Sequence, residues 1–87
     1  MKTREILSII PNGTVVKVKQ VAIKQLGGGD DVLRFFDSVE RALASNQNYL
    51  EFNAVSLKQE AGIITVVCKA SAEQELMIVR SWYECHA

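Results

Sequence analysis

The chain has 87 residues, of which 48% are hydrophobic and 23% are charged, as expected for one small globular domain spanning residues 1–87. Ten Lys and Arg residues balance ten Asp and Glu residues, and this zero net charge argues against a dedicated nucleic-acid binder, which needs excess positive charge to neutralise phosphates. The two cysteines lack the CxxC spacing of a zinc or redox site, and no run of about 18 apolar residues predicts a membrane-spanning helix. We therefore expect a chain that is cytoplasmic as it stands, or periplasmic if it is a fragment of a membrane-anchored protein.

The first 26 residues predict a short helix followed by a long strand. "TREILSII" (3–10) has apolar residues on one helical face and Thr3 as its N-cap, and "PNG" (11–13) ends it. "TVVKVKQVAIKQL" (14–26) is rich in β-branched residues, with valines and lysines on alternate faces. The apolar residues change face beyond Gln20, which indicates a β-bulge or a sharp bend near that residue.

The segment after the glycines of "LGGGDD" (26–31) predicts an amphipathic helix of about four turns over residues 31–44. Four apolar residues recur at the spacing i, i+4, i+7 and i+11, namely Val32, Phe36, Val39 and Leu43. Asp30 would be the N-cap of this helix, with its carboxylate accepting from the first free backbone amides. Phe35 would lie on the side away from the apolar stripe.

Two strands follow this predicted helix. "YLEFNAVSLK" (49–58) and "GIITVVCKA" (62–70) are joined by "QEAG", which is typical of a hairpin. The second strand is apolar on both faces, and we expect it to be central in the sheet. Cys68 lies in this strand and is expected to be a small buried side chain rather than a reactive one.

The last segment, residues 71–87, is compatible with a helix or with a fourth strand over residues 76–83. Ser71 and Gln74 form a capping-box pattern, and a helical apolar stripe follows them, so we favour the helix. The stripe consists of Ala72, Leu76, Val79 and Tyr83. Three further apolar residues lie off it, namely Met77, Ile78 and Trp82, and they suggest a partner surface.

The resulting order, α-β-α-β-β-α, predicts an α+β fold with a small antiparallel or mixed sheet of three to four strands and two to three helices. We expect a ferredoxin-like arrangement, in which the helices pack on one face of the sheet.

The glycine-aspartate segment also permits a catalytic interpretation. "GGDDVLRFF" resembles the Gly-Gly-Asp-Asp/Glu signature of nucleotide cyclase and CRISPR-type palm domains, and that resemblance implies Asp30 and Asp31 as metal ligands of a metal-dependent nucleotide enzyme. Two-metal chemistry needs carboxylates from more than one element, however, and residues 14–26 contain no Asp or Glu. His86 stands beside Cys85, but adjacent side chains diverge on a helix or strand and make no catalytic pair. We therefore predict no enzyme activity, with no catalytic, cofactor-binding or metal residues and no cofactor.

A resemblance extends over most of the chain. "ILSIIPNGTVVKV" looks like the helix, P-x-G and strand opening of periplasmic ferredoxin-like domains in type IV pilus and type II secretion inner-membrane platform proteins. "VLRFFDSVERAL" and the two strands after it are similar to their helix–strand–hairpin close. Those domains normally place two strands between their first two helices, whereas the pattern here predicts one long strand. The resemblance implies a scaffold component that dimerises or co-assembles and has no enzymatic activity.

These observations predict a protein–protein interaction and assembly domain that associates with itself. The candidate contact residues are Phe35, Met77, Ile78 and Trp82. A small phage- or plasmid-type inhibitor that binds a protein partner is an alternative that fits the length and neutrality equally well. A nucleic-acid binder using Lys17, Lys19 and Lys24 is a third class, but the sequence shows no exposed aromatics between these lysines.

Overall fold

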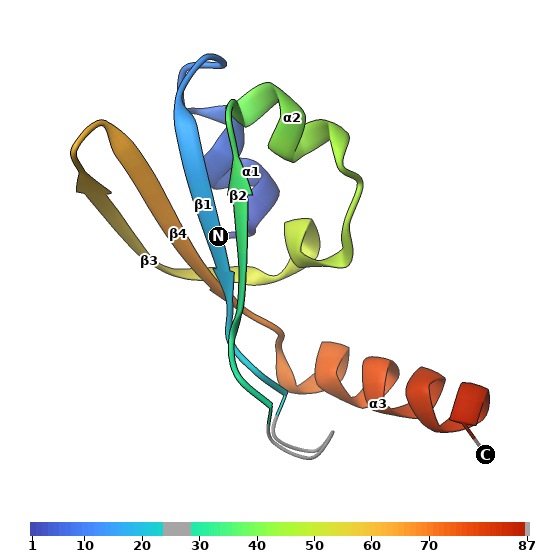
Figure 1. Ribbon diagram of the computed structural model, residues 1–87. Helices are drawn as coiled ribbons and strands as arrows, with labels where there is room; N and C mark the ends of the chain where they lie inside the picture. Colours follow the sequence, from blue (N-terminus) through green and yellow to red (C-terminus); the bar gives the residue numbers. More distant parts are fainter. Residues whose placement is uncertain (24–28, 87) are drawn as a thin grey trace.

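The computed structural model describes residues 1–23 and 29–86 and has an α+β architecture (Figure 1). The elements in chain order are α1 (Thr3–Ser8), β1 (Val15–Gln20), β2 (Val32–Phe36), α2 (Val39–Ala44), the 3₁₀ helix η2 (Asn48–Glu51), β3 (Asn53–Glu60), β4 (Ile63–Lys69) and α3 (Ala72–His86). The predicted α+β class is confirmed, with four strands in a mixed sheet and three α-helices among the described residues. The predicted order is wrong in one respect, because two strands rather than one separate the first two helices.

The sheet has the strand order β2-β1-β4-β3. Central strand β1 pairs antiparallel with β2 on one side and parallel with β4 on the other, and β3 pairs antiparallel with β4. Two hairpins therefore lie side by side, joined through their inner strands (Figure 1). The ferredoxin-like arrangement that we predicted is not confirmed by this strand order.

Residues 31–44 form a strand and a short helix instead of one long helix. Positions i and i+4 share a face in a strand as well as in a helix, so Val32 and Phe36 fit both structures. Residues Val32–Phe36 pair with β1 over five positions and thereby satisfy the backbone groups along one edge of that strand. The helix begins only at Val39, and its N-cap is Ser38 rather than Asp30.

Smaller corrections concern the element boundaries. Thr3 is the first residue of α1 rather than its cap, and its buried hydroxyl donates to the backbone oxygen of Phe52 (3.0 Å). β1 ends at Gln20, and the sheet irregularity lies in β3 between Ala54 and Ser56 instead of near Gln20. Residues 24–26 of the predicted long strand lie outside the described residues.

The β3–β4 hairpin is confirmed and is closed by Ala61 and Gly62. Both have positive φ, of 53° and 78°, which is the backbone conformation that a two-residue hairpin turn requires. The start of the hairpin's first strand was predicted wrongly, because the strand expected over residues 49–58 begins only at Asn53, after the 3₁₀ helix η2. The hairpin extends beyond the helices in Figure 1, and Leu57 near its tip is exposed for that reason.

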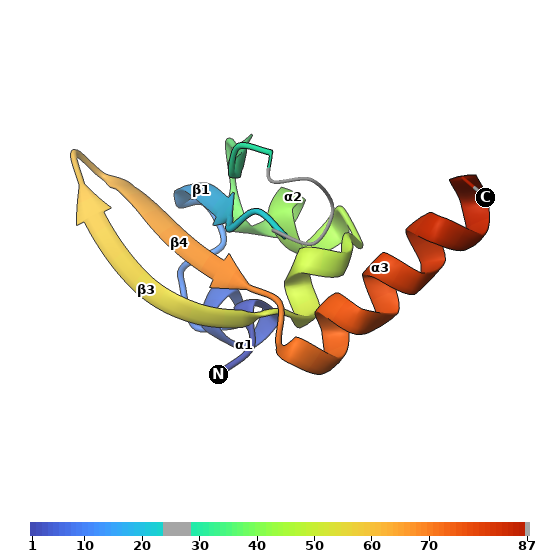
Figure 2. The same ribbon diagram turned by 90° about the horizontal axis from the view of Figure 1, so that it is seen from below.

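The core lies between one face of the sheet and the layer formed by α1, α2 and η2 (Figure 2). Val18 of β1 and Val66 of β4 are register partners and are both fully buried. The layer above them contributes the fully or almost fully buried side chains of Leu7, Val39, Ala42, Tyr49 and Leu50. Cys68 is fully buried in this core, as predicted.

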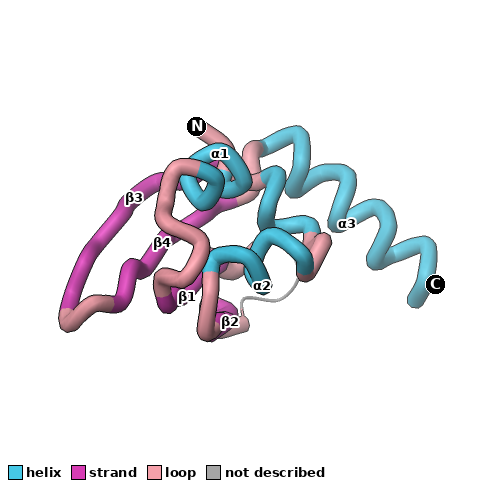
Figure 3. Tube along the Cα trace, turned by 90° about the horizontal axis from the view of Figure 1, so that it is seen from above, coloured by secondary structure: helices cyan, strands magenta, loops and turns pink. Residues whose placement is uncertain are grey.

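The C-terminal segment is a helix, and the strand alternative for residues 76–83 is wrong. The predicted capping box is present: the Gln74 backbone amide donates to the Ser71 hydroxyl (3.1 Å), and the Ser71 amide donates to the Gln74 side chain (2.9 Å). Helix α3 leaves the end of β4 and extends away from α1 and α2 (Figure 3). Within the part of the chain that the structure describes, no helix has both the length and the apolarity needed to cross a membrane.

Candidate interaction surfaces

Helix α3 is joined to the rest of the protein near its beginning. The Gln74 side-chain amide donates to the backbone oxygen of Glu51 (2.8 Å), and Ile78 packs against the core cluster. The carboxylate of Glu51 in turn accepts from Lys2 Nζ (3.2 Å) and Arg4 Nε (3.0 Å) of the first helical segment. The hydrogen bonds from Arg4 and Lys2 lower the pKa of Glu51 from its ordinary value. Glu51 thus connects the N-terminal segment to α3.

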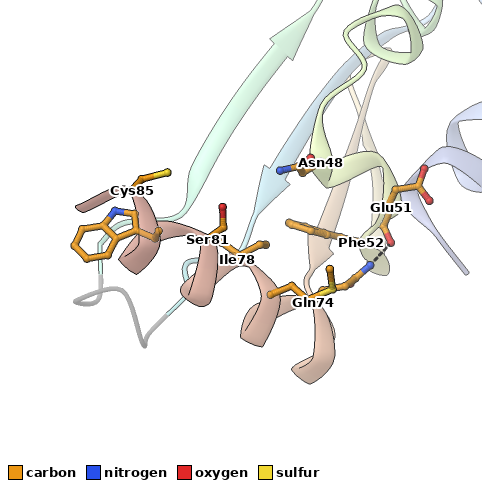
Figure 4. A pocket seen from close by; sticks show the side chains of 9 residues that line it. Asn48, Glu51, Phe52, Gln74, Ile78, Ser81 and Cys85 are labelled. Carbon is orange, nitrogen blue, oxygen red and sulfur yellow. Dashed lines mark hydrogen bonds between the residues drawn. The ribbon is translucent and has the colours of Figure 1, made fainter. Parts of the chain in front are cut away.

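A groove of about 560 Å³ runs between α3 and η2 (Figure 4). Phe52 and Ile78 point toward each other at its base, and Met77 and Trp82 also line it. The lining residues of α3 recur at helical spacing and define one side of the helix: Gln74, Met77, Ile78, Ser81, Trp82 and Cys85. This side of α3 is therefore apolar at its centre and only partly covered by the protein.

The opposite side of α3 is also apolar. Leu76, Val79 and Tyr83 recur at i, i+3 and i+7 and form a stripe on the side of the helix away from the groove. The Leu76 and Tyr83 side chains are 60% and 56% exposed. A helix that is apolar on two sides is normally buried between other elements, yet the described residues cover only one of these sides.

The structure places the predicted partner residues on two separate surfaces. Met77 and Trp82 are 67% and 42% exposed on α3, whereas Ile78 is partly buried against the core. Phe35 lies on strand β2 and not on a helix, with 60% of its surface exposed. The sequence did not indicate that Leu76 and Tyr83 would be exposed, because their stripe has the regular spacing of a core-facing side and nothing in the pattern shows which side of the helix meets the sheet.

The second surface is the face of the sheet that none of the described helices covers (Figure 2), which we call the open sheet face. The strand register places five partly or largely exposed apolar residues on it, namely Val15, Leu33, Phe35, Ile63 and Val67. Phe35 is the register partner of Lys17, whose Nζ lies 6.0 Å from the centre of the Phe35 ring. An exposed aromatic side chain is thus interleaved with the lysines of β1, which the sequence alone did not reveal.

Charge is segregated between the two surfaces. The open sheet face carries four lysines, Lys17, Lys19, Lys58 and Lys69. Two of them have acidic neighbours, since Lys19 pairs with Asp31 (3.7 Å) and Lys58 pairs with Glu60 (3.6 Å). Helix α3 has three glutamates against one arginine. The zero net charge of the chain is therefore the sum of a basic sheet face and an acidic helix.

The aspartates of the glycine-rich segment have structural partners. Asp31 accepts from the backbone amide of Ala22 (2.9 Å) in addition to its ion pair with Lys19, which ties the ends of the β1–β2 connection together. Asp30 precedes a strand and is exposed. Among the residues that the structure describes, no group of three or more His, Cys, Asp or Glu side chains is placed to hold a metal ion.

Two titratable side chains of the core, Cys68 and Tyr49, have structural roles. Burial raises the pKa of the Cys68 thiol and that of the Tyr49 hydroxyl, so both groups stay protonated near neutral pH. The Tyr49 hydroxyl lies 3.0 Å from Ser45 Oγ, and the Arg34 guanidinium lies 4.9 Å from the centre of its ring. Cys85 is a free, exposed cysteine on α3.

Comparisons with protein-family models, with curated proteins and with solved structures found no match for this chain. The function is therefore inferred from α3 and the open sheet face.

Proposed function

We propose that this chain is a non-enzymatic assembly domain that works by protein–protein association, first of all with a second copy of itself. The observation that carries the proposal is α3, a helix of 15 residues with apolar side chains on two sides. Isolated helices of this length are marginal in water, because most helical stability comes from packing of an apolar side. A partner that covers Leu76 and Tyr83, which are 60% and 56% exposed, supplies packing that the described residues do not give these two side chains.

A scaffold role in a pilus or secretion machine is consistent with the order of the elements. The domains that the sequence resembles place two strands between their first two helices and close on a hairpin. The chain has β1 and β2 between α1 and α2, and it closes on the β3–β4 hairpin before α3. A small phage- or plasmid-type inhibitor is the alternative, in which a different protein covers α3.

Self-association is tested by sedimentation velocity and light scattering over a range of protein concentrations. The wild-type chain is expected to change from monomer to dimer as concentration rises. Replacing Leu76 and Tyr83 by serine removes exposed apolar surface from the contact, and a loss of about 1.4 kcal/mol per side chain weakens dimerisation about tenfold for each.

Ile9→Ser is the matched control, because Ile9 is a large hydrophobic residue that is 72% exposed beside α1 and far from α3 in sequence. Circular dichroism verifies that each variant is folded. A wild-type chain that stays monomeric at millimolar concentration contradicts self-association and leaves the inhibitor alternative.

A further inference from the structure

We propose that the occupant of the open sheet face is helix α3 of a second copy of this chain. The proposal rests on the self-association proposed above and adds which two surfaces meet. It joins the two places where the structure exposes apolar side chains, the stripe of Leu76, Val79 and Tyr83 on α3 and the apolar residues around Phe35 on the sheet.

The contact must be intermolecular. Ile78 packs against the core, and Figure 2 shows α3 on the same side of the sheet as α1 and α2. The helix of one chain therefore lies on the wrong side to cover its own open sheet face. A helix from another copy would complete a layer on that face, as helices do in sheets that are covered on both sides.

The two surfaces match in size and in apolar character. A 15-residue helix is about 22 Å long, and strands of five to eight residues are about 17–26 Å long. The helix can therefore lie over the sheet without a long overhang. Leu76, Val79 and Tyr83 would meet Leu33 and Phe35 along with the smaller residues of β4.

The charges favour this contact over the pairing of two α3 helices. Glu75 lies on one side of the apolar stripe of α3, and Glu73 and Glu84 lie on the other together with Arg80, the one basic residue of the helix, so both glutamate-bearing sides leave α3 acidic overall. Within residues 1–23 and 29–86, Lys17 and Lys69 form no ion pair in their own chain. Docking brings these glutamates to the lysines of the sheet face, whereas two α3 helices side by side would bring like charges together.

Charge reversal with rescue tests the arrangement. Lys17→Glu/Lys69→Glu makes the sheet face acidic, and Glu75→Lys/Glu84→Lys makes α3 basic. Each variant alone is expected to dimerise at least tenfold more weakly than wild type in sedimentation equilibrium. An equimolar mixture is expected to form a 1:1 heterodimer within about threefold of the wild-type Kd, because in it both helix–sheet contacts again join opposite charges.

Two further variants keep the test independent of folding defects. Phe35→Ser leaves the charges unchanged and removes an exposed side chain from the sheet face. It is expected to weaken dimerisation without lowering the melting temperature measured at protein concentrations where the chain is monomeric. Glu40→Lys on α2 is the control, because it reverses a charge at an exposed site outside both surfaces and is expected to leave dimerisation unchanged.

The outcomes separate the two proposals. A wild-type dimer that none of these charge variants weakens overturns the docking of α3 on the sheet and leaves self-association standing. A wild-type monomer overturns both. Nucleic acid is the other ligand that a basic sheet face with an exposed aromatic side chain could bind, and fluorescence anisotropy with a labelled 20-nucleotide oligo-dT tests it. If the oligonucleotide binds in a salt-sensitive way, and Lys17→Glu/Lys69→Glu abolishes this binding but leaves the dimer unchanged, the sheet face binds nucleic acid and the docking proposal is overturned.

Discussion

The position of the helix cap decides whether residues 31–44 are one long helix or a strand followed by a short helix. Ser38 Oγ accepts from the backbone amide of Arg41 (3.2 Å) at the start of α2, whereas Asp30 precedes β2. Replacing a serine cap by alanine costs about 1 kcal/mol, because one amide in the first turn loses its partner. We expect this cost for Ser38→Ala and a change within about 0.5 kcal/mol for Asp30→Ala, which is an exposed site.

The assay is thermal unfolding followed by circular dichroism at one fixed protein concentration. An unfolding entropy of about 2.1 cal/mol/K per residue gives about 0.18 kcal/mol/K for 87 residues, so a loss of 1 kcal/mol lowers Tm by about 5 °C. Ser38→Ala should therefore melt about 5 °C below wild type, and Asp30→Ala within about 3 °C of it. The opposite ranking, with Asp30→Ala the more damaging change, would refute the assignment of β2 and restore the long helix.

Two other predictions concern groups that tie the helical layer together. Glu51 has a lowered pKa in the folded protein, so its pairing with Lys2 and Arg4 stabilises the fold above the unfolded pKa near 4.5 and is lost as pH falls through the folded value. The difference in Tm between wild type and Glu51→Gln should therefore be positive at pH 7 and should shrink as the pH is lowered below 4.5. Tyr49→Phe removes a buried hydroxyl that lies 3.0 Å from Ser45 Oγ and donates to the backbone oxygen of Ala42. Urea unfolding should show that the free energy of unfolding falls by about 1 kcal/mol with an unchanged m-value. An unchanged free energy of unfolding would show that the Ser45 hydroxyl alone is a sufficient donor to the Ala42 oxygen.

Local patterns predicted much of the fold. The capping box at Ser71 and Gln74, the hairpin closed at Ala61-Gly62 and the burial of Cys68 all depend on residues close together in sequence, and the structure has each of them. The segment Val32–Phe36 was misassigned because its apolar residues four apart satisfy two periods. Pairing with β1 makes this segment a strand rather than a helix, and the spacing of apolar residues within a segment does not predict which distant strand it pairs with.

The same limit applies to the candidate surfaces. Met77 and Trp82 were singled out from the spacing of apolar residues on a helix, and both are exposed. The pattern could not show that Ile78 would face the core while Leu76 and Tyr83 face outward, because α3 has apolar residues on two sides and either could have met the protein. The open sheet face could not be predicted from the sequence, because Phe35 lies beside the lysines of β1 only when β2 pairs with β1.

Charge segregation also changes what the neutral composition means. A zero net charge gives little long-range repulsion between copies, so it permits association without orienting it. An acidic α3 and a basic sheet face on the same chain would orient it, because docking of α3 on the sheet face brings opposite charges together, whereas pairing of like surfaces brings an excess of like charges together. Added salt should therefore weaken the helix–sheet contact, whereas an interface held by apolar burial alone would be little affected or strengthened. The sign of the salt dependence of the dimer thus distinguishes docking on the sheet from a purely apolar pairing of α3 helices.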